Sequence, residues 1–533
     1  MASLDGLHFI AGKAEAGSGE AFHGLDPHSG EQHKPDYCEA SPEQIQRACA
    51  AAAAAAPVFA ARGAKVRAEL LRAIGDGLAA LGDELVQRVQ AETALPTARI
   101  EGERARTVMQ LQQFAALVEE GSWVDARIDH GDPKRAPMPK PDLRRMFVPL
   151  GPVVVFGASN FPLAYSVAGG DTASALAAGC PVIVKGHPAH PGTSELVGRV
   201  VQAAVQRLGL PEGVFSLLHG NSHEIGGALV RAPEVQAVGF TGSHAGGRAL
   251  HDLAAARPRP IPVFAEMGSA NPVVILPNAL RDRGAEVAEQ LVSSALLAQG
   301  QFCTSPGLVM WLHGEGGEAF SSVLRERLVK SSAGPAVHPT IRQAYDRAMQ
   351  DVAKLPVEVD HAEAQSGGGD AGASKGASEV CPALLRATPQ ALLDNPRLRS
   401  EIYGPALLAV PCRTVEEMQQ VVDSLEGHLT ATVHGDGDDF ASSQGVIDAL
   451  RNRVGRLIAN GVPTGVEVSP AMVHGGPYPA ASDARFSAVG ATSITRWVRP
   501  ACWQDWPQDQ LPEQLRDSNP LGIERLVNGV RGR

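Results

Sequence analysis

The sequence has little of several features that mark particular classes of protein. Its 533 residues carry a formal net charge of -11, whereas nucleic-acid-binding proteins need a basic surface. No apolar run reaches the roughly 18 residues of a membrane span, and the N-terminus lacks the basic and apolar regions of a secretory signal. We therefore expect a cytoplasmic protein that binds neither nucleic acid nor membrane.

Cysteine is also scarce. The chain has seven cysteines, an odd number, and no two of them form a C-x-x-C pair. This pattern argues against a disulfide framework or a zinc site and fits a reducing compartment. The pair His187 and His190 lacks an evident third ligand, and Pro188 disrupts a helical i, i+3 pairing. No metal site is predicted.

The dinucleotide fingerprint G-x-G-x-x-G is missing. From residue 151 onward, however, apolar β-branched runs such as "GPVVVFG", "CPVIVKG" and "IPVFAEMG" alternate with helical segments. This alternation predicts an α/β fold with a parallel sheet covered by helices. A second block of the same kind starts at "NPVVILPN", and a low-complexity stretch at 362–379 interrupts it as a predicted surface loop.

The first 150 residues have a different character. Residues 41–120 show apolar positions at helical spacing and much alanine, which predicts three scaffold helices. Residues 122–150 contain several prolines and short alternating stretches, and we expect a hairpin that leaves the main body.

Polar residues stand at the ends of several predicted strands, where parallel sheets bind their ligands. Asn160 and Lys185 follow two of these strands, and Glu266 ends a strand that is otherwise apolar. A buried unpaired carboxylate is costly, so Glu266 has a partner, faces water or takes part in catalysis. Cys303 lies in the turn "GQFCTSPG". An amide donor, a base and a thiol are the three groups that thiol-based acyl chemistry requires.

One further turn points to a phosphate group. "GFTGS" ends a predicted strand and opens a helix at Gly242 and Ser243. The free N–H groups of a helix start favour a phosphate there.

The motifs "GASNFP", "VIVKG", "GFTGS", "EMGSANP", "GQFCTSPG" and "EIYGPAL", in this order and spacing, resemble the aldehyde dehydrogenase superfamily. The resemblance covers essentially the whole chain. "KGHPAHPGTS" and the late "NGVPTGVEVSPAMVHGG" resemble its NADP-dependent branch, which contains α-ketoglutaric semialdehyde (2,5-dioxovalerate) dehydrogenases and a bacterial fatty aldehyde dehydrogenase. The resemblance implies NADP-dependent oxidation of 2,5-dioxovalerate to 2-oxoglutarate. A broad or long-chain fatty aldehyde dehydrogenase is the alternative, and a non-catalytic structural relative is the remote one.

The resemblance also implies catalytic roles. Cys303 is the nucleophile that forms a thiohemiacetal and then a thioester, Asn160 and the Cys303 N–H hold the oxyanion, and Glu266 activates the hydrolytic water. The presence of Glu266 argues against CoA-acylating or acyl-phosphate relatives, which commonly lack it. A thiol hydrolase would need a histidine base, and no histidine stands in a matching context.

The cofactor contacts follow from the same resemblance. Lys185 is expected at the adenosine ribose and its phosphate, Gly242 and Ser243 at the pyrophosphate, and Glu401 at the nicotinamide ribose, with Tyr403 packed near the ring.

The loop after Lys185 bears on the choice between NAD and NADP. Many NAD-using relatives carry "K-P-x-E" here, but this chain has "KGHP", with Pro188 at the Glu position. A carboxylate would repel a 2′-phosphate, so its absence favours NADP, with NAD as a second possibility. His187 and His223 are candidate contacts for that phosphate.

The sequence says less about the aldehyde. A substrate carboxylate needs a cationic anchor, and Arg106 is the candidate, with a surface salt-bridge arginine as the alternative reading. Phe161, Phe302 and Leu111 would suit an apolar substrate, and they leave the question open.

The resemblance finally implies two Rossmann-like parallel-sheet domains and a small three-stranded oligomerisation sheet, in a homodimer or homotetramer. "SITRWVRP" alternates as an exposed strand of that sheet would. The expected division is 1–127 with 150–264 for the cofactor, 265–455 for catalysis, 128–149 with 484–533 for oligomerisation and the tail, and 456–483 as a segment returning to the cofactor domain.

Overall fold

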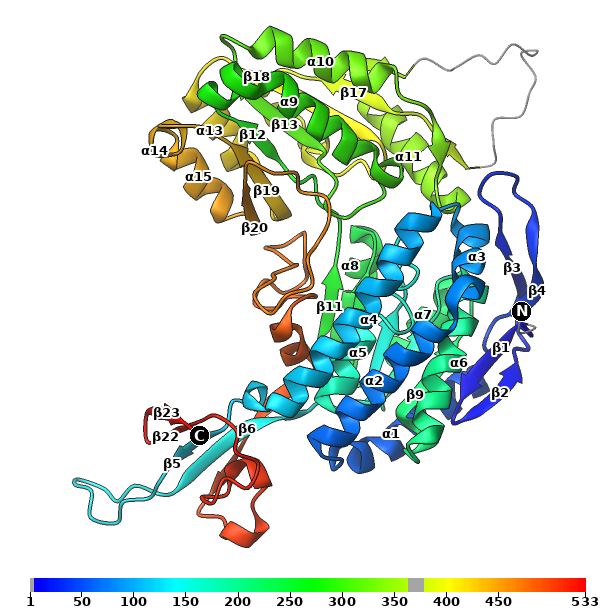
Figure 1. The fold of residues 1–533 in the computed structure, drawn as a ribbon, viewed down its shortest axis with the longest axis vertical. Helices are drawn as coiled ribbons and strands as arrows, with labels where there is room; N and C mark the ends of the chain where they lie inside the picture. The colour runs from blue at the N-terminus through cyan, green and yellow to red at the C-terminus, as the bar shows by residue number, and fades with distance from the viewer. Residues whose placement is uncertain (1–3, 363–377) are drawn as a thin grey trace.

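A computed structural model describes residues 4–362 and 378–533 of the chain. Two α/β lobes lie one above the other, and a smaller β arm that carries the C-terminus projects from the lower lobe (Figure 1). The loop predicted at 362–379 lies almost wholly outside the described residues. Among the helices that are described, none has the length and apolar character needed to cross a membrane.

The lower lobe is built on a seven-stranded sheet. Its strands are β1 (Leu7–Ile10), β2 (Lys13–Ala16), β7 (Val153–Phe156), β8 (Val182–Lys185), β9 (Phe215–Leu218), β10 (Ala237–Thr241) and β11 (Val263–Glu266). They lie in the order β11-β10-β7-β8-β9-β1-β2. The strands β7 to β11 are parallel, as predicted, and their apolar runs are covered on both faces. The N-terminal pair β1 and β2, which the sequence analysis did not foresee, extends the sheet in the antiparallel sense.

Eight helices of this lobe are described: α1 (Pro42–Ala60), α2 (Ala64–Ala80), α3 (Gly82–Thr93), α4 (Thr97–Glu120), α5 (Gly170–Ala178), α6 (Pro191–Arg207), α7 (His223–Arg231) and α8 (His244–Ala255). The second of the three predicted scaffold helices is divided into α2 and α3. The chain turns at Gly82, whose φ of +53° is a conformation that glycine adopts without strain. A hairpin of β3 (Ala21–Leu25) and β4 (Gln32–Cys38) lies beside these helices.

The upper lobe repeats the parallel-sheet plan. Its sheet has the order β15-β17-β18-β13-β12-β19-β20 and is parallel except for β15. The strands are β12 (Val273–Ile275), β13 (Leu308–Leu312), β15 (Glu358–His361), β17 (Ala383–Arg386), β18 (Ala406–Cys412), β19 (His428–His434) and β20 (Val454–Ala459). The helices are α9 (Pro277–Leu296), α10 (Gly317–Val329), α11 (Pro339–Val352), α12 (Pro389–Asp394), α13 (Val415–Ser424), α14 (Asp439–Ser442) and α15 (Gln444–Arg451). A short pair, β14 (Gly334–Pro335) with β16 (Glu379–Val380), completes this lobe.

The arm contains the predicted hairpin, but its sheet is larger than expected. The strands are β5 (Arg127–Asp129), β6 (Leu143–Pro149), β21 (Val498–Gln504), β22 (Arg525–Val527) and β23 (Val530–Gly532). They form one sheet in the order β21-β6-β5-β22-β23, so the C-terminal pair adds two strands to the three predicted.

The prediction that "SITRWVRP" forms an exposed strand is wrong over most of its length. Residues of η5 (Ala491–Trp497) form a 3₁₀ helix, and the strand begins only at Val498. Ile494 and Trp497 are three residues apart, so the helix turns both into the core of the lower lobe. The Trp497 indole N–H donates to Ser174 Oγ at 2.7 Å. Residues three apart share one face of a 3₁₀ helix, whereas in a strand they would point to opposite faces.

Candidate active site

Cys303 lies in the turn that joins the end of α9 to β13, between the two lobes. Gly300 has a φ of +68°, and a Cβ at this position would collide with the Gly404 carbonyl, so the turn requires glycine here. The Asn271 side-chain amide donates to the Cys303 carbonyl at 2.9 Å and fixes the other side of the turn. The thiol is therefore held by backbone contacts on both sides.

The predicted oxyanion donor is beside this turn. Asn160 follows β7, and its Nδ2 donates to the carbonyl of Gln301 at 2.9 Å. Gln301 is only two residues before Cys303, so the structure brings the amide and the thiol together, and the second N–H of the amide remains for another acceptor.

Glu266 is the last residue of β11 and is buried. Its Oε2 has no hydrogen-bond partner among the described residues. Burial raises the pKa of this carboxyl well above its ordinary value, Arg496 lowers it, and Asp171 raises it further. Glu266 also raises the pKa of Cys303, which shows that the two side chains interact electrostatically. A buried carboxyl with a raised pKa is typical of a catalytic acid or base.

The structure adds a histidine that the sequence analysis missed. Nε2 of His474 lies 3.5 Å from Cys303 Sγ, although the two residues are 171 positions apart in the chain. Burial lowers the pKa of His474 to about 3, and three arginines lower it as well, so the imidazole is neutral. The prediction that no histidine stands in a suitable place for the thiol was wrong. The available signal was "VHGG", in which the glycine after His474 lets the backbone approach the Phe486 carbonyl closely.

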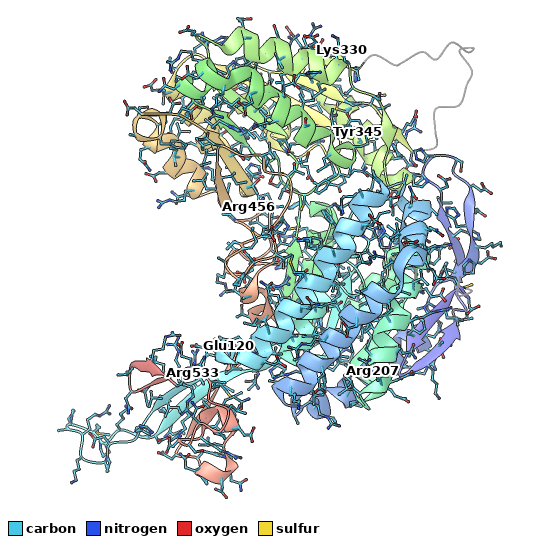
Figure 2. All side chains as sticks on the ribbon, viewed as in Figure 1. Glu120, Arg207, Lys330, Tyr345, Arg456 and Arg533 are labelled. Atoms are coloured by element: carbon cyan, nitrogen blue, oxygen red, sulfur yellow. The ribbon has the colours of Figure 1, made fainter. Side chains whose placement is uncertain are left out.

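The resting thiol is also neutral. Burial raises the pKa of Cys303 to about 12, and Glu266 and Glu401 add to this effect. Arg106 and Arg456 oppose it. Arg456 belongs to β20 and, as Figure 2 shows, lies at the base of the upper lobe, facing the space between the lobes. The electrostatic field of both lobes therefore acts on the sulfur.

A cavity of about 330 Å³ opens on one side of the thiol. Its walls include the predicted residues Arg106, Phe161 and Phe302, together with Cys303 itself and Arg99. The rings of Phe161 and Phe302 pack edge to face, with centroids 5.2 Å apart. Leu111 is not among the lining residues and lies in the core of the lower lobe. The cavity is thus aromatic and cationic rather than purely apolar.

Arg106 is not a surface salt-bridge residue. Its Nε donates to the Val466 carbonyl and its Nη2 to the Tyr165 hydroxyl, each at 3.3 Å. The remaining nitrogen, Nη1, is buried and has no partner among the described residues. Such a donor is costly unless a ligand pairs with it.

Arg99 is a second cation that the sequence analysis did not single out. It lies seven positions before Arg106 on α4, which places both on one face of the helix. Its guanidinium pairs with Glu103 at 2.6 Å and lies 4.5 Å from the ring centroid of Phe161. Its Nε and Nη2 are buried without partners among the described residues. Two arginines therefore line the cavity, and each keeps buried N–H groups without a partner among the described residues.

Lys185 and the turn of Gly242 and Ser243, which are predicted to hold a dinucleotide, lie at the carboxyl edge of the lower sheet. Lys185 ends β8, is buried, and its ammonium makes no hydrogen bond with the described residues. Burial lowers the pKa of Lys185 to about 8. A desolvated cation without a hydrogen-bond acceptor fits a site for a phosphate or ribose group.

The two candidate histidines differ. His187 accepts a hydrogen bond from the Ala189 N–H at 3.1 Å, and burial lowers its pKa well below the ordinary value. Its imidazole is therefore neutral and offers no positive charge to a phosphate. His223 begins α7 and is exposed.

The Gly-Ser turn opens α8 as predicted. Ser243 caps the helix, because its Oγ accepts from the Gly246 N–H. The N–H of Gly242 is already engaged, since it donates to the Glu266 carbonyl at 3.0 Å. The first turn of α8 is largely exposed, so its remaining N–H groups are available to an anion.

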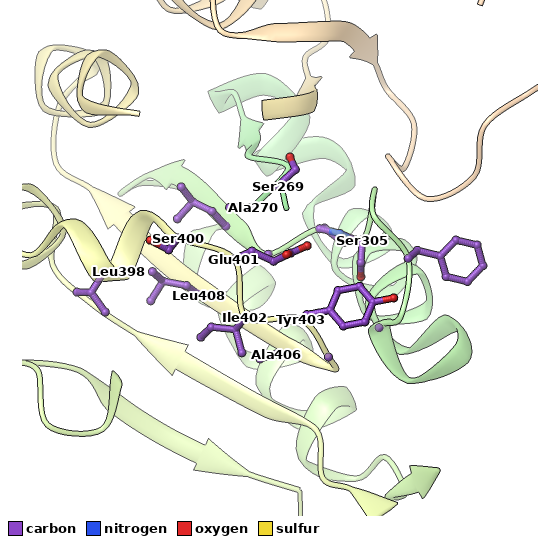
Figure 3. A pocket seen from close by; sticks show the side chains of 16 residues that line it. Ser269, Ala270, Ser305, Leu398, Ser400, Glu401, Ile402, Tyr403, Ala406 and Leu408 are labelled. Carbon is purple, nitrogen blue, oxygen red and sulfur yellow. The ribbon is translucent and has the colours of Figure 1, made fainter. Parts of the chain in front are cut away.

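Glu401 and Tyr403 line a narrow pocket on the other side of the Cys303 turn. Figure 3 shows their side chains in this pocket with Ser269 and Ser305 nearby. Burial raises the pKa of Glu401 to about 7, and the Ser269 N–H opposes this shift. Phe302 lines this pocket as well as the arginine cavity. The turn that bears the nucleophile therefore separates two pockets.

Taken together, these groups fit a dinucleotide: a buried lysine without a hydrogen bond to the described residues and an open helix start in the lower lobe, and the buried Glu401 carboxyl in the upper lobe. Over the described ranges, no group of three or more His, Cys, Asp or Glu side chains is arranged to hold a metal ion.

Comparison with known proteins identifies the chain at the level of a family. The model described as "Aldehyde dehydrogenase family" matches residues 14–478. Alpha-ketoglutaric semialdehyde dehydrogenase 2 of Azospirillum brasilense is 50% identical over 530 residues, 99% of each chain. Alpha-ketoglutaric semialdehyde dehydrogenase of Acinetobacter baylyi is 39% identical over 531 residues, again 99% of each.

Solved structures confirm the predicted fold class. A crystal structure of betaine aldehyde dehydrogenase from Staphylococcus aureus has a TM-score of 0.80 at 18% identity and covers 96% of this chain and 97% of its own. Lactaldehyde dehydrogenase from Escherichia coli gives 0.79 at 19% identity, with 93% and 98% covered. With a family match over most of its length and a full-length relative at 50% identity, the chain belongs to the aldehyde dehydrogenase family.

Proposed function

We propose that this enzyme oxidises 2,5-dioxovalerate (α-ketoglutaric semialdehyde) to 2-oxoglutarate, with NADP⁺ as the preferred cofactor. The observation that carries the proposal is Arg106, which lines the cavity beside Cys303 and whose buried Nη1 has no partner among the described residues. The names of the two relatives above support the same substrate. A long-chain aldehyde would leave these guanidinium donors unpaired, which disfavours it.

The arginines would hold the acid end of the substrate. A carboxylate pairs well with the planar fork of a guanidinium, and Arg106 has a free N–H to offer it. The free Nε and Nη2 of Arg99 are suited to the 2-oxo oxygen or to the second carboxylate oxygen. With its acid end held in this way, the substrate would direct its aldehyde carbon toward Cys303.

Attack begins from a neutral thiol. As the sulfur bonds to the aldehyde carbon, its proton has His474 Nε2 within reach at 3.5 Å. The Asn160 amide and the Cys303 N–H would stabilise the negative charge that forms on the aldehyde oxygen. The field of Arg106 and Arg456 favours the thiolate during this step.

Turnover then depends on Glu266. The bound cofactor supplies an acceptor for the hydride that leaves the substrate carbon. Glu266 would take a proton from the water that hydrolyses the resulting thioester on Cys303, which releases the acid and restores the thiol. Its unpaired Oε2 is available for that proton.

Cofactor placement, assembly and compartment complete the proposal. The dinucleotide would bind through Lys185 and the start of α8 around Ser243 in the lower lobe and through Glu401 in the upper lobe, with Tyr403 near the nicotinamide. The upper lobe would carry the nucleophile. The projecting β arm would pair with a second copy, giving a homodimer or homotetramer in the cytoplasm, because its sheet edges lie outside the main body.

A substrate panel tests the function. Reduction of NADP⁺ and of NAD⁺ is followed at 340 nm with 2,5-dioxovalerate, glutarate semialdehyde, succinate semialdehyde, and short and long alkanals. We expect the highest kcat/KM with 2,5-dioxovalerate and NADP⁺. A higher kcat/KM with long alkanals would contradict the substrate, and a preference for NAD⁺ would contradict the cofactor.

A further inference from the structure

The loop after Lys185 lacks a carboxylate, but the structure brings one to the same place from the N-terminal segment. Glu39 directly follows β4. The N–H of the next residue, Ala40, donates to the His219 carbonyl at 3.1 Å, so this segment runs along the end of β9. Because β9 is the neighbour of β8 in the sheet, Glu39 reaches the edge where Lys185 ends its strand.

The Glu39 carboxylate is firmly oriented there. Its Oε1 accepts from the Asn221 N–H at 2.7 Å and from the Ser222 N–H, and its Oε2 accepts from Ser222 Oγ at 2.9 Å. These bonds and the start of α7 favour the ionised form, and the pKa of Glu39 is lowered. A carboxylate offers about four acceptor positions, so one on Oε2 remains free.

Glu39 and Lys185 also act on one another electrostatically. The Glu39 charge raises the pKa of Lys185, and the Lys185 charge lowers that of Glu39. Glu39 is only half-buried, which leaves its free acceptor accessible to a ligand. A carboxylate that only capped α7 would not need to lie near the buried Lys185, so the position of Glu39 indicates a further role.

We propose that Glu39 controls the choice between NAD⁺ and NADP⁺. It replaces, from a distant part of the sequence, the carboxylate that Pro188 leaves out of the loop. Its free acceptor would bind the 2′-hydroxyl of NAD⁺, whereas its negative charge would repel the 2′-phosphate of NADP⁺. The enzyme would therefore prefer NADP⁺ less strongly and would also use NAD⁺. This inference rests on the proposed position of the adenosine ribose at Lys185.

Equilibrium binding to the full-length enzyme tests it directly. Kd values for NADP⁺ and for NAD⁺ are measured by calorimetry, without aldehyde, for the wild type, Glu39→Gln and the control Glu43→Gln. Glu43 is an exposed carboxylate on α1, four residues away. We expect Glu39→Gln to change the ratio of the two Kd values in favour of NADP⁺ by at least about tenfold, because a like-charge contact is removed. The control should leave the ratio unchanged.

The outcomes separate this inference from the proposed function. Equal losses of affinity for both cofactors, or an unchanged ratio in Glu39→Gln, would mean that Glu39 is a helix cap only and would overturn the inference. Failure of the wild type to bind either cofactor would refute the proposed function itself. Should Glu39→Gln not fold, Glu39→Asp moves the charge away from Lys185 by one methylene. It should change the ratio in the same direction by a smaller factor, and an unchanged ratio would again overturn the inference.

Discussion

Replacement of Arg106 by methionine should change the substrate preference of the enzyme more than its chemistry. Methionine keeps an unbranched apolar stem along the wall of the cavity and removes the guanidinium. The variant loses the buried Nη1 donor that has no acceptor in the described part of the chain, and with it the proposed bond to the substrate carboxylate.

The expected size of the effect follows from that one bond. A hydrogen bond to a charged partner contributes about 1.5–3 kcal/mol. Since about 1.4 kcal/mol corresponds to a factor of ten in rate, kcat/KM for 2,5-dioxovalerate should fall by about 10- to 150-fold. A neutral aldehyde such as pentanal never makes this bond and is affected only through the electrostatic effect of Arg106 on Cys303, which both substrates share, so the ratio of the two kcat/KM values should still fall by about 10- to 150-fold.

The assay compares these two substrates at saturating cofactor, so that the ratio of their kcat/KM values cancels any general loss of active enzyme. Arg104→Met is the matched control, because Arg104 lies on the same helix but donates to the Gly82 carbonyl at 2.6 Å and does not line the cavity. Equal losses for both aldehydes in Arg106→Met would refute the reasoning, since they would show that Arg106 acts only through the fold or through the Cys303 thiolate and not on the substrate carboxylate.

Three further predictions concern the reacting groups. Glu266→Gln should give a burst of reduced cofactor in rapid mixing and then almost no turnover, because the thioester still forms but its hydrolysis lacks the base. Normal steady-state turnover of this variant would rule out the role of Glu266 as base. His474→Asn should slow alkylation of Cys303 by iodoacetamide at pH 7.5 several-fold while the melting temperature stays within about 2 °C, and an unchanged alkylation rate would show that the imidazole does not assist the thiol. Burial raises the pKa of Cys303 to about 12 and that of Glu266 well above its usual range, so both reactive anions are minor species at neutral pH. The rate of Cys303 alkylation should therefore increase steadily between pH 6 and 9. A rate that does not change over this range would contradict the raised pKa of Cys303.

The sequence was informative where function depends on local pattern. Asn160 and Glu266 could be placed because Asn160 follows a buried apolar strand and Glu266 ends one, and the ends of parallel strands gather at one edge of a sheet. The position of Cys303 followed from the family resemblance of its turn. These expectations depend on short strands, whose continuous apolar runs are easily recognised in the sequence.

The residues that escaped prediction reach the site through long-range contacts. His474 lies in a segment without regular secondary structure, so no periodicity indicates where its ring points. Glu39 comes from an N-terminal segment whose strands had not been recognised. Trp497 was misread because spacing alone does not separate a short 3₁₀ helix from a strand when the buried face is unknown.

The turn that bears Cys303 separates two pockets, and this arrangement affects how ligands enter and leave the enzyme. Phe302 lines both the arginine cavity and the pocket of Glu401. With the aldehyde and the dinucleotide placed as proposed, the two would therefore reach the turn of Cys303 from different sides. The carboxylic acid could then depart while the nucleotide is still bound, and a molecule that blocks the aldehyde side would hold the enzyme with its nucleotide in place.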